Sequence, residues 1–323
     1  MHVYWFQDSK VGHLKQVQAL LDGIAKEINF TITKLHCANR NIYGFFQPLS
    51  KLILAQNTND QPVLLIGAGH STYPNILRAQ RLLKKNTNAF SVAILKPSFN
   101  SNAFDLICAP EHDYPKQFKA NNVFTFKGSL AATSFAEPID NKGIIAVGGS
   151  SKHYAFDNSL VAKQIEYILT SFPHHHFNIF NTRRTPKSLN KIILKMSDNF
   201  HNFAFIEVDS PLAGSFQDDV ATSELKFVTP DSSNLVFEAL SSKGKTYLMQ
   251  IERLGRFKLF GSNKIRVLIG SLVSSRQVGT IDINAMSPDL NIHKIEHPMA
   301  SLEPMAEVEK TSYAILNLLL QKK

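Results

Sequence analysis

The sequence predicts an α/β protein with two doubly wound parallel sheets, and three observations lead to this prediction. Short apolar segments of strand length alternate with amphipathic segments of helix length along the whole chain, which is typical of parallel sheets covered by helices. A polar, turn-rich stretch at 136–143 divides these segments into two series. With 323 residues, 44% of them hydrophobic, the chain has enough apolar material for two cores.

The first series predicts a domain over residues 1–137. Its strands are short apolar segments, expected at 3–6, 30–35, 62–67, 90–95, 105–109 and 122–124. Helices with apolar positions three or four residues apart are expected at 14–28 and 72–83. In this order, each helix follows a strand and returns the chain for another parallel strand.

The second series predicts a domain over residues 138–303. Strands are expected at 144–147, 177–180, 203–207, 224–229 and 246–249, and helices at 159–169, 189–195 and 233–240. A C-terminal helix is expected at 304–323 and is predicted to pack back on the first domain. Its predicted apolar positions are Met305, Val308, Tyr313, Ile315 and Leu318–Leu320.

The amino-acid composition indicates the cellular compartment in which the protein is expected. Cys37 and Cys108 have no Cys or His at metal-ligand spacing, so neither a disulfide framework nor a zinc site is expected, and a reducing compartment is favoured. The first eight residues lack the pattern of a signal peptide, and no segment reaches the roughly 18 apolar residues of a membrane-spanning helix. The sequence therefore predicts a cytoplasmic protein.

The net charge of the chain indicates which classes of binding partner are expected. The chain has 35 Lys and Arg against 26 Asp and Glu, and this net charge of +9 favours an anionic partner such as nucleotide phosphates or an anionic membrane surface. It has no recognisable nucleic-acid-binding motif and no concentrated basic block, so no nucleic-acid partner is predicted. The apolar segment 42–54 suits a membrane-facing patch, which would make the protein peripheral at the inner face of the membrane, and equally suits a buried helix.

Ligands of open parallel sheets bind beyond the carboxyl ends of the strands, so the loops after the predicted strands are the candidate sites. After the first strand come Asp8, Gly12 and His13. Gly12 permits close backbone approach, and His13 is suited as a general base for an acceptor hydroxyl. The alternative is that Asp8 only organises the turn and His13 only begins the helix.

Two further loops of the first domain carry polar residues. After the strand at 62–67, a glycine-containing loop suits phosphate or sugar, or else forms a tight turn; it comprises Gly69, His70, Ser71 and Thr72. After the strand at 105–109, three titratable side chains suit acid–base chemistry or polar-ligand binding, or else form an exposed turn. They are Glu111, His112 and Asp113.

The second domain has three loops compatible with phosphate. The first follows the strand at 144–147, where backbone N–H groups and a lysine suit a diphosphate; it comprises Gly148, Gly149, Ser150, Ser151 and Lys152. The second follows the strand at 177–180 and offers planar guanidinium groups, or else a solvated surface pair; it comprises Thr182, Arg183, Arg184 and Thr185.

The third phosphate-compatible loop follows the strand at 224–229 and opens a helix. Asp231, Ser232 or Ser233 can cap this helix, and its free N–H groups can bind phosphate. Asn234 and Glu238 are four residues apart and share a helix face, so Glu238 is placed to accept hydrogen bonds from a ribose diol.

These loops together resemble a known family. The stretches 8–13, 67–72, 110–113, 148–152, 182–186 and 229–233, with Glu238, are similar in sequence and order to bacterial relatives of the plant elongated-mitochondria fission protein. That family is grouped with glycosyltransferases of the GT-B type. The resemblance implies two Rossmann-like domains facing a cleft, with the acceptor on the first domain and a nucleotide-sugar donor on the second.

The reaction implied by the resemblance is transfer of a sugar from a nucleotide diphosphate to a hydroxyl of a lipopolysaccharide-core or lipid-linked acceptor. GT-B enzymes use basic side chains and helix N-termini to stabilise the departing diphosphate, so no metal and no other cofactor are expected. His13 is the expected base, with Asp8 or Glu111 as substitutes. The histidines at 174–176 lack further ligands in sequence and are not expected to bind metal.

Two alternatives remain open from the sequence. One is a binding or recruitment protein that keeps a GT-B scaffold without turnover, as the mitochondrial-fission relatives suggest. The other is a nucleotide-sugar epimerase, which would require His13 and Glu111 to face one another across the bound donor.

Overall fold

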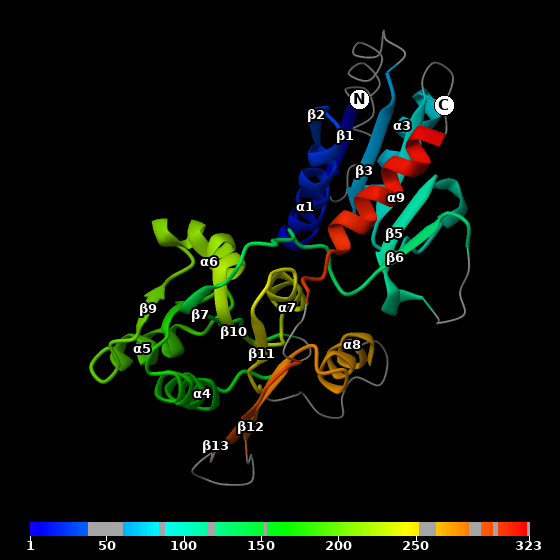
Figure 1. Cartoon of the computed structure of the whole chain (residues 1–323). Coiled ribbons are helices and arrows are strands. Elements are labelled where there is room, and N and C mark those ends of the chain that lie inside the picture. The colour runs from blue at the N-terminus through cyan, green and yellow to red at the C-terminus, as the bar shows by residue number, and fades with distance from the viewer. Residues whose placement is uncertain are drawn as a thin grey trace. The chain divides into compact units, whose positions relative to one another are not determined.

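The computed structural model describes residues 1–37, 61–83, 88–114, 120–151, 154–251, 263–283, 292–299 and 303–321. The chain forms two compact units, each built around its own sheet (Figure 1). The first unit joins Met1–Ala132 to Ala306–Lys323, and the second is Thr133–Met305. The apolar segment 42–54 lies outside the described residues.

The sheet of the first unit has six parallel strands in the order β2-β1-β3-β4-β5-β6. The strands are β1 (His2–Gln7), β2 (Thr31–His36), β3 (Val63–Ala68), β4 (Ala89–Ile94), β5 (Leu106–Pro110) and β6 (Val123–Phe126). All six predicted strands are confirmed, with small shifts at their ends. The central strands β3 and β4 are buried throughout, as parallel strands covered on both faces require.

Helices cover both faces of this sheet. They are α1 (Val11–Glu27), α3 (Tyr73–Leu83) and α9 (Glu307–Gln321), with short 3-10 turns η1 (Ser101–Ala103) and η2 (Glu111–Asp113). Alternate residues of β1 divide between the two cores, so that Trp5 packs with α1 and α9 while Phe6 packs with α3. Helix α1 begins three residues earlier than predicted, so its first turn contains Gly12 and His13.

The buried stripe of α9 differs in part from the predicted one. Val308 and Ile315 are buried as expected, but Tyr313 is 72% exposed and Leu320 is 48% exposed. The buried positions follow the helical repeat through Leu319, and Tyr313 lies off that stripe. Met305 precedes the helix and packs in the second unit.

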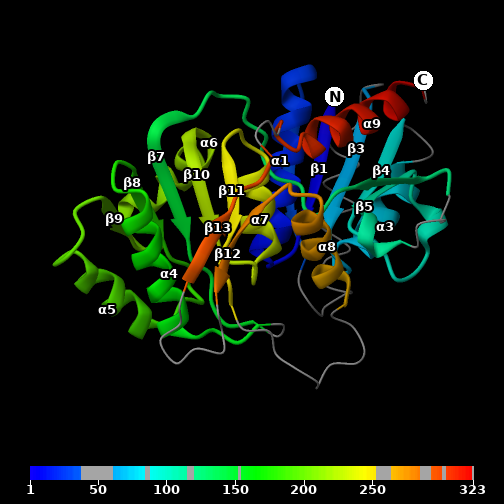
Figure 2. The same cartoon turned by 60° about the horizontal axis from the view of Figure 1, so that its bottom comes forward.

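The sheet of the second unit has seven strands in the order β13-β12-β11-β10-β7-β8-β9 (Figure 2). They are β7 (Ile139–Ala146), β8 (His176–Phe180), β9 (Phe203–Ile206), β10 (Ser223–Val228), β11 (Lys245–Leu248), β12 (Gly279–Ile283) and β13 (Ile292–Glu296). All neighbours pair in parallel except β12 and β13, which are antiparallel. From β7 to β12 the strands follow the 3-2-1-4-5-6 order of dinucleotide-binding sheets.

The helices of the second unit again lie on both faces. They are α4 (Asn158–Ser171), α5 (Lys187–Met196), α6 (Phe216–Thr222), α7 (Ser233–Leu240) and α8 (Asn263–Ser274), with the 3-10 turn η3 (Pro211–Ser215). Helices α4 and α5 share one core, whereas α7 and α8 share the other. The bounds of α7 agree with the prediction, which places its first turn directly after β10.

The structure corrects the prediction around 136–143. This stretch was expected to be a turn-rich connection, but β7 already begins at Ile139, five residues before the predicted strand. Its polar first half is exposed and pairs with β10 across a register shift. Asn141 has a left-handed backbone there, with φ of 60°, so the turn-forming residues serve an irregularity inside a strand.

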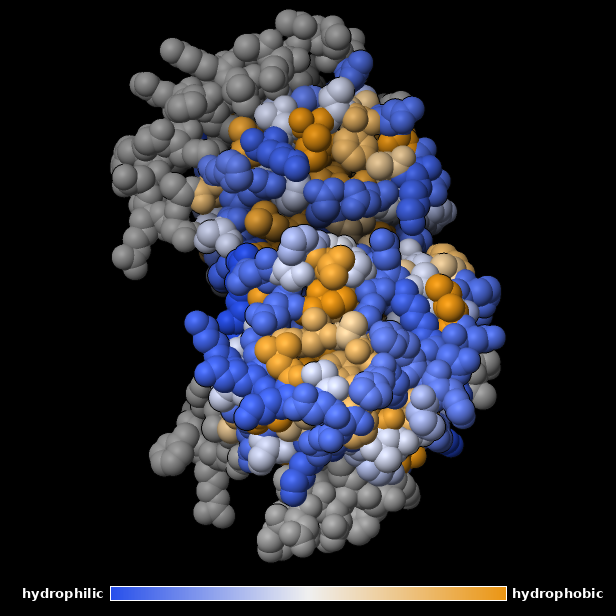
Figure 3. All heavy atoms as spheres, turned by 90° about the vertical axis from the view of Figure 1, so that its left-hand side faces the viewer, coloured by the Kyte–Doolittle hydropathy of each residue, from blue (hydrophilic) through white to orange (hydrophobic). Residues whose placement is uncertain are grey.

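Among the described residues, no helix is long and apolar enough to span a bilayer. Figure 3 looks onto the side where α5, β9 and α6 lie, and hydrophilic atoms surround a limited apolar hollow on the second unit. The edge strand β9 has only four residues, which limits its pairing with another chain.

Candidate functional site

Each sheet has one place where the strand order reverses, and the predicted residues follow the strands on either side of it. In the first unit the reversal lies between β1 and β3, which precede Asp8 and Gly69. In the second unit it lies between β7 and β10, which precede Gly148 and Thr229. Ligands of doubly wound sheets bind at such positions because the two loops there diverge.

Asp8 and His13 form a hydrogen-bonded pair in the first unit. His13 Nδ1 lies 2.7 Å from Asp8 Oδ2, and the Asp8 side chain is 4% exposed against 18% for His13. Asp8 Oδ1 accepts the backbone N–H of Lys10 at 3.1 Å, which fixes the carboxylate in its turn. Because a carboxylate only accepts, Nδ1 is the donor in this contact, and in the neutral form of the ring Nε2 carries the lone pair.

Gly69 makes room for this pair. Its φ is +90°, a conformation that glycine adopts readily. A Cβ at this position would lie 2.6 Å from His13 Nδ1 and 2.9 Å from Asp8 Oδ2. The glycine that the sequence associates with a phosphate or a turn therefore serves close packing against the Asp8–His13 pair.

The other predicted acceptor-side residues of this loop have different environments. Thr72 is fully buried, and its hydroxyl donates to Gly69 O at 2.8 Å, which closes the turn. His70 is exposed, with its ring 5.6 Å from that of Tyr73. Ser71 is half-buried beside them. Gly12 is helical, and its carbonyl accepts Gln16 Nε2 at 3.3 Å.

Glu111, His112 and Asp113 form η2, after β5. Two strands, β3 and β4, separate β5 from β1, which at about 4.8 Å per strand places the ends of β1 and β5 roughly 14 Å apart. The structure therefore does not bring Glu111 to His13. Lys96, which the sequence analysis missed, lies near η2 and donates to Asp113 O at 3.0 Å.

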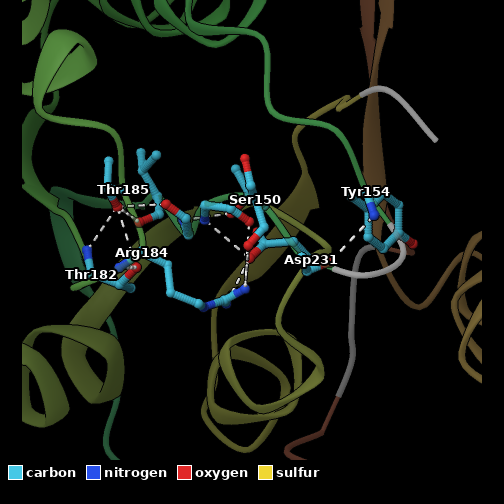
Figure 4. A network of polar contacts seen from close by, with 11 residues as sticks. Ser150, Tyr154, Thr182, Arg184, Thr185 and Asp231 are labelled. Carbon is cyan, nitrogen blue, oxygen red and sulfur yellow. Dashed lines mark hydrogen bonds and ion pairs between the residues drawn. The ribbon is translucent and has the colours of Figure 1, made fainter. Parts of the chain in front are cut away.

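In the second unit, the loops after β7, β8 and β10 meet in one polar network (Figure 4). Arg184 Nη2 lies 2.7 Å from Asp231 Oδ2, and Arg184 Nη1 donates to the carbonyls of Gly149 and Ser150, both at 3.4 Å. The same Asp231 oxygen accepts the Gly149 N–H at 3.1 Å. One buried carboxylate therefore links the three predicted loops.

Threonines complete the network. The Thr185 hydroxyl lies 2.9 Å from Val147 O and accepts the Thr182 N–H at 2.9 Å. Gly148 N–H donates to Thr229 Oγ1 at 2.7 Å. Each bond joins a strand end to its own loop or to a neighbouring one, so the carboxyl edge of this sheet is internally braced.

The loop after β7 has no room for side chains at Gly148 and Gly149, and the N–H groups of both residues donate to other groups of the protein. A Cβ on Gly148 would overlap the Asp231 carboxylate, and one on Gly149 would overlap the Arg184 backbone. The N–H groups of Gly148 and Gly149 bond to Thr229 and Asp231, and that of Ser151 donates to Tyr154 O at 3.1 Å. Lys152 lies outside the described residues.

The start of α7 offers backbone donors instead. Ser232 is the N-cap residue, and its side chain makes no capping hydrogen bond. The first helical bond runs from Val236 N to Ser232 O, so the N–H group of Ser233 has no acceptor within the helix. Glu238 lies one turn further along, with 8% of its surface exposed.

Lys226 is a buried residue of this unit that the sequence analysis did not single out. It lies on β10 and is fully enclosed, with Nζ donating to Ser242 Oγ at 2.7 Å. The signal available in the sequence was a lysine between two apolar residues, Leu225 and Phe227, of a predicted strand. Of the histidines at 174–176, His175 Nε2 lies 3.1 Å from Glu224 Oε2, and the described residues contain no cluster of ligands able to hold a metal ion.

Two doubly wound sheets, each with polar loops at its strand reversal, define a two-unit α/β protein of the GT-B kind. The chain belongs to the family described as mitochondrial fission ELM1, whose sequence model matches residues 11–317. No curated protein sequence matches it.

Solved structures are similar to this chain at low sequence identity, and the two with a TM-score above 0.5 share its fold. UDP-GlcNAc 2-epimerase from Neisseria meningitidis bound to UDP-GlcNAc is 15% identical, with 99% of this chain and 100% of that chain covered and a TM-score of 0.55. UDP-GlcNAc 2-epimerase from Methanocaldococcus jannaschii is 12% identical, with 98% and 100% covered and a TM-score of 0.51. ADP-heptose LPS heptosyltransferase II from E. coli is 10% identical, with 100% and 99% covered and a TM-score of 0.45.

Proposed function

We propose that the protein is a glycosyltransferase that moves a sugar from a nucleotide-diphosphate donor to a hydroxyl group. The observation that carries the proposal is the strand reversal of the second unit, where the start of α7 lies next to the loops that contain Gly149 and Arg184. Family membership and the fold shared with nucleotide-sugar proteins support it.

The donor diphosphate would bind at the start of α7. The N–H group of Ser233 lies at the positive end of the helix dipole, which favours an anion. The exposed Arg183 adds a cation on the neighbouring loop. Glu238, one turn into α7, would accept hydrogen bonds from the ribose hydroxyls.

His13 would act as the base on the acceptor side, with Asp8 holding its ring. The Nε2 lone pair takes the proton from the acceptor hydroxyl while that oxygen bonds to the anomeric carbon of the sugar. The bond between this carbon and the donor phosphate breaks, and the nucleoside diphosphate leaves with the electron pair. Asp8 then stabilises the imidazolium, as a carboxylate next to a catalytic histidine does.

The acceptor class is proposed from the family resemblance and the net charge. A hydroxyl of a lipopolysaccharide core or of a lipid-linked glycan fits a protein with a net charge of +9 that works next to anionic lipid. Basic side chains and the α7 N-terminus would offset the charge of the leaving group, so the proposal requires no metal cofactor.

The two alternative functions, recruitment protein and epimerase, require different arrangements of His13 and Glu111 from the one that a transferase requires. A recruitment protein of the ELM1 family needs no base, yet Asp8 and His13 are held in a geometry suited to proton transfer. An epimerase that uses His13 with Glu111 needs these side chains to face one another, and they follow strands separated by two others. The transferase is therefore the function that the described residues support best.

Donor binding is the first test. UDP-, GDP-, ADP- and dTDP-linked sugars would each be added to the protein, and unfolding would be followed by scanning fluorimetry. A specific donor present at 100 times its Kd adds about 2.7 kcal/mol to the free energy of unfolding and should raise the Tm. If none of the four classes of donor raises the Tm, the proposal is wrong.

The base is tested separately. With the donor that binds, His13→Ala should lower kcat by about 100- to 10,000-fold, because general-base catalysis is lost. Asp8→Asn should also lower kcat, whereas donor affinity should be unchanged in both variants because the donor residues lie on the other unit. Glu111→Gln is the matched control, and a loss of kcat in this variant equal to that of His13→Ala would contradict the assignment.

A further inference from the structure

The adjacent arginines of the β8 loop have different surroundings. The side chain of Arg183 is exposed and makes no hydrogen bond or ion pair with any other described residue. That of Arg184 is 43% exposed, and its guanidinium is directed at three protein oxygens, one of Asp231 and the carbonyls of Gly149 and Ser150. The two residues are therefore not equivalent phosphate ligands.

The burial of the Asp231 carboxylate explains why the Arg184 guanidinium is held in an ion pair with it. Its side chain is 0% exposed, and among the described residues Oδ1 has no hydrogen-bond partner, so the pairing with Arg184 and the Gly149 N–H at Oδ2 must offset the cost of burial. Asp231 also directly precedes the N-cap residue of α7. An unpaired carboxylate here would repel a diphosphate at the helix start.

The loop is packed so tightly that it cannot relax without this ion pair moving. Gly148 lies against the Asp231 carboxylate and Gly149 against the Arg184 backbone, each too close for a Cβ. The Arg184–Asp231 contact therefore sets the position of both the glycine loop and the start of α7.

We propose that Arg184 is a positioning residue that holds the Gly149–Ser150 loop and the start of α7 through Asp231, and that Arg183 is the arginine that contacts the donor diphosphate. This inference rests on the proposed function and divides one predicted pair into two roles. Arg184 needs its planar fork to reach several acceptors at once, whereas Arg183 needs only a positive charge that can reach the phosphate.

The experiment measures nucleoside-diphosphate affinity by calorimetry and the Tm by scanning fluorimetry in matched variants. Arg183→Ala should lower affinity by about 10- to 100-fold with the Tm unchanged, and Arg183→Lys should restore most of that affinity. Arg184→Ala should lower both affinity and the Tm, the latter by roughly 10 °C, and Arg184→Lys should not restore either.

A second substitution separates positioning from contact. Adding Asp231→Asn to Arg184→Ala removes the uncompensated buried charge and should recover most of the Tm and of the affinity, although no side chain at 184 could then reach a phosphate. If the double variant regains the Tm but not the affinity, Arg184 contacts the ligand and the inference is overturned. The same holds if Arg184→Ala loses affinity with an unchanged Tm.

Different measurements would contradict the role of Arg184 and the proposed function. If the wild-type protein binds no nucleoside diphosphate, the proposed donor site is wrong, and the assignment of Arg183 falls with it. The positioning role of Arg184 is still judged by the Tm of Arg184→Ala and of the double variant. An unchanged Tm in Arg184→Ala would refute that role independently of any ligand.

Discussion

Lys226 connects the core of the second unit to the helix that begins at the proposed donor site. Its Nζ donates to Ser242 O at 2.9 Å and to Lys243 O at 2.6 Å, in the turn that follows α7. Lys226 thus fixes one end of α7, while the other end lies next to Asp231.

This buried lysine should make stability depend on pH. Burial lowers the pKa of Lys226 to about 7, from 10.5 in the unfolded chain. Between these values the unfolded chain binds a proton that the folded protein does not, so stability should fall as the pH falls toward 7 and then stop depending on this group. The slope is at most about 1.4 kcal/mol per pH unit.

Urea unfolding between pH 7.5 and 9 would measure this slope. In Lys226→Met the group is absent, so the variant should lack the contribution, whereas Lys187→Met on the exposed start of α5 should keep it. Equal slopes for the wild type and Lys226→Met would show that the lysine keeps its proton when buried.

At the scale of elements, local sequence was sufficient where a segment is uniformly apolar or strongly periodic. Strands such as β3 and β4 and the helix α7 were predicted within two residues because their burial leaves no alternative pattern. Helices α6 and α8 and strands β12 and β13 were missed. Helix α6 has only seven residues, two of them adjacent aspartates, so it carries hardly any helical period.

In other segments, tertiary contacts stabilise a secondary structure that differs from the one the local sequence favours. The polar start of β7 is a strand because β10 offers it backbone partners, which a turn-forming composition does not reveal. Gly23 in the middle of α1 looks unfavourable for a helix, yet a Cβ there would lie 2.6 Å from Val308 Cγ1 of α9. Position 23 is a glycine because of a contact with a residue 285 positions further along the chain (308 − 23), and a local sequence pattern does not reveal such a contact.

At the scale of the whole molecule, strand order determines which predicted loops meet. The loops themselves were found from the sequence because each follows an apolar strand. That Arg184 meets Asp231, 47 residues away, depends on β7 lying between β8 and β10, an order that local periodicity does not encode. By the same order, Glu111 is kept away from His13 although both follow strands of one sheet.

The return of the chain to the first unit is also a property of the whole molecule, and it has a testable consequence. Helix α9 buries four apolar side chains in the core of the first unit, namely Val308, Ile315, Leu316 and Leu319. Full burial of each contributes about 1.5–3 kcal/mol, and their sum is comparable to the stability of a whole domain. Deleting residues 306–323 should therefore unfold the first unit.

Hydrogen exchange read by mass spectrometry would localise the effect. In the deletion variant, β1 and β3 should lose protection, whereas β7 and β10 should keep it, because the second unit has its own core and retains Met305. Tyr313→Ala is the matched control, since that side chain is 72% exposed and its loss should leave protection unchanged. Equal loss of protection in both sheets would mean that the two units unfold as one cooperative body, and intact protection of β1 would mean that α9 is dispensable to the core it covers.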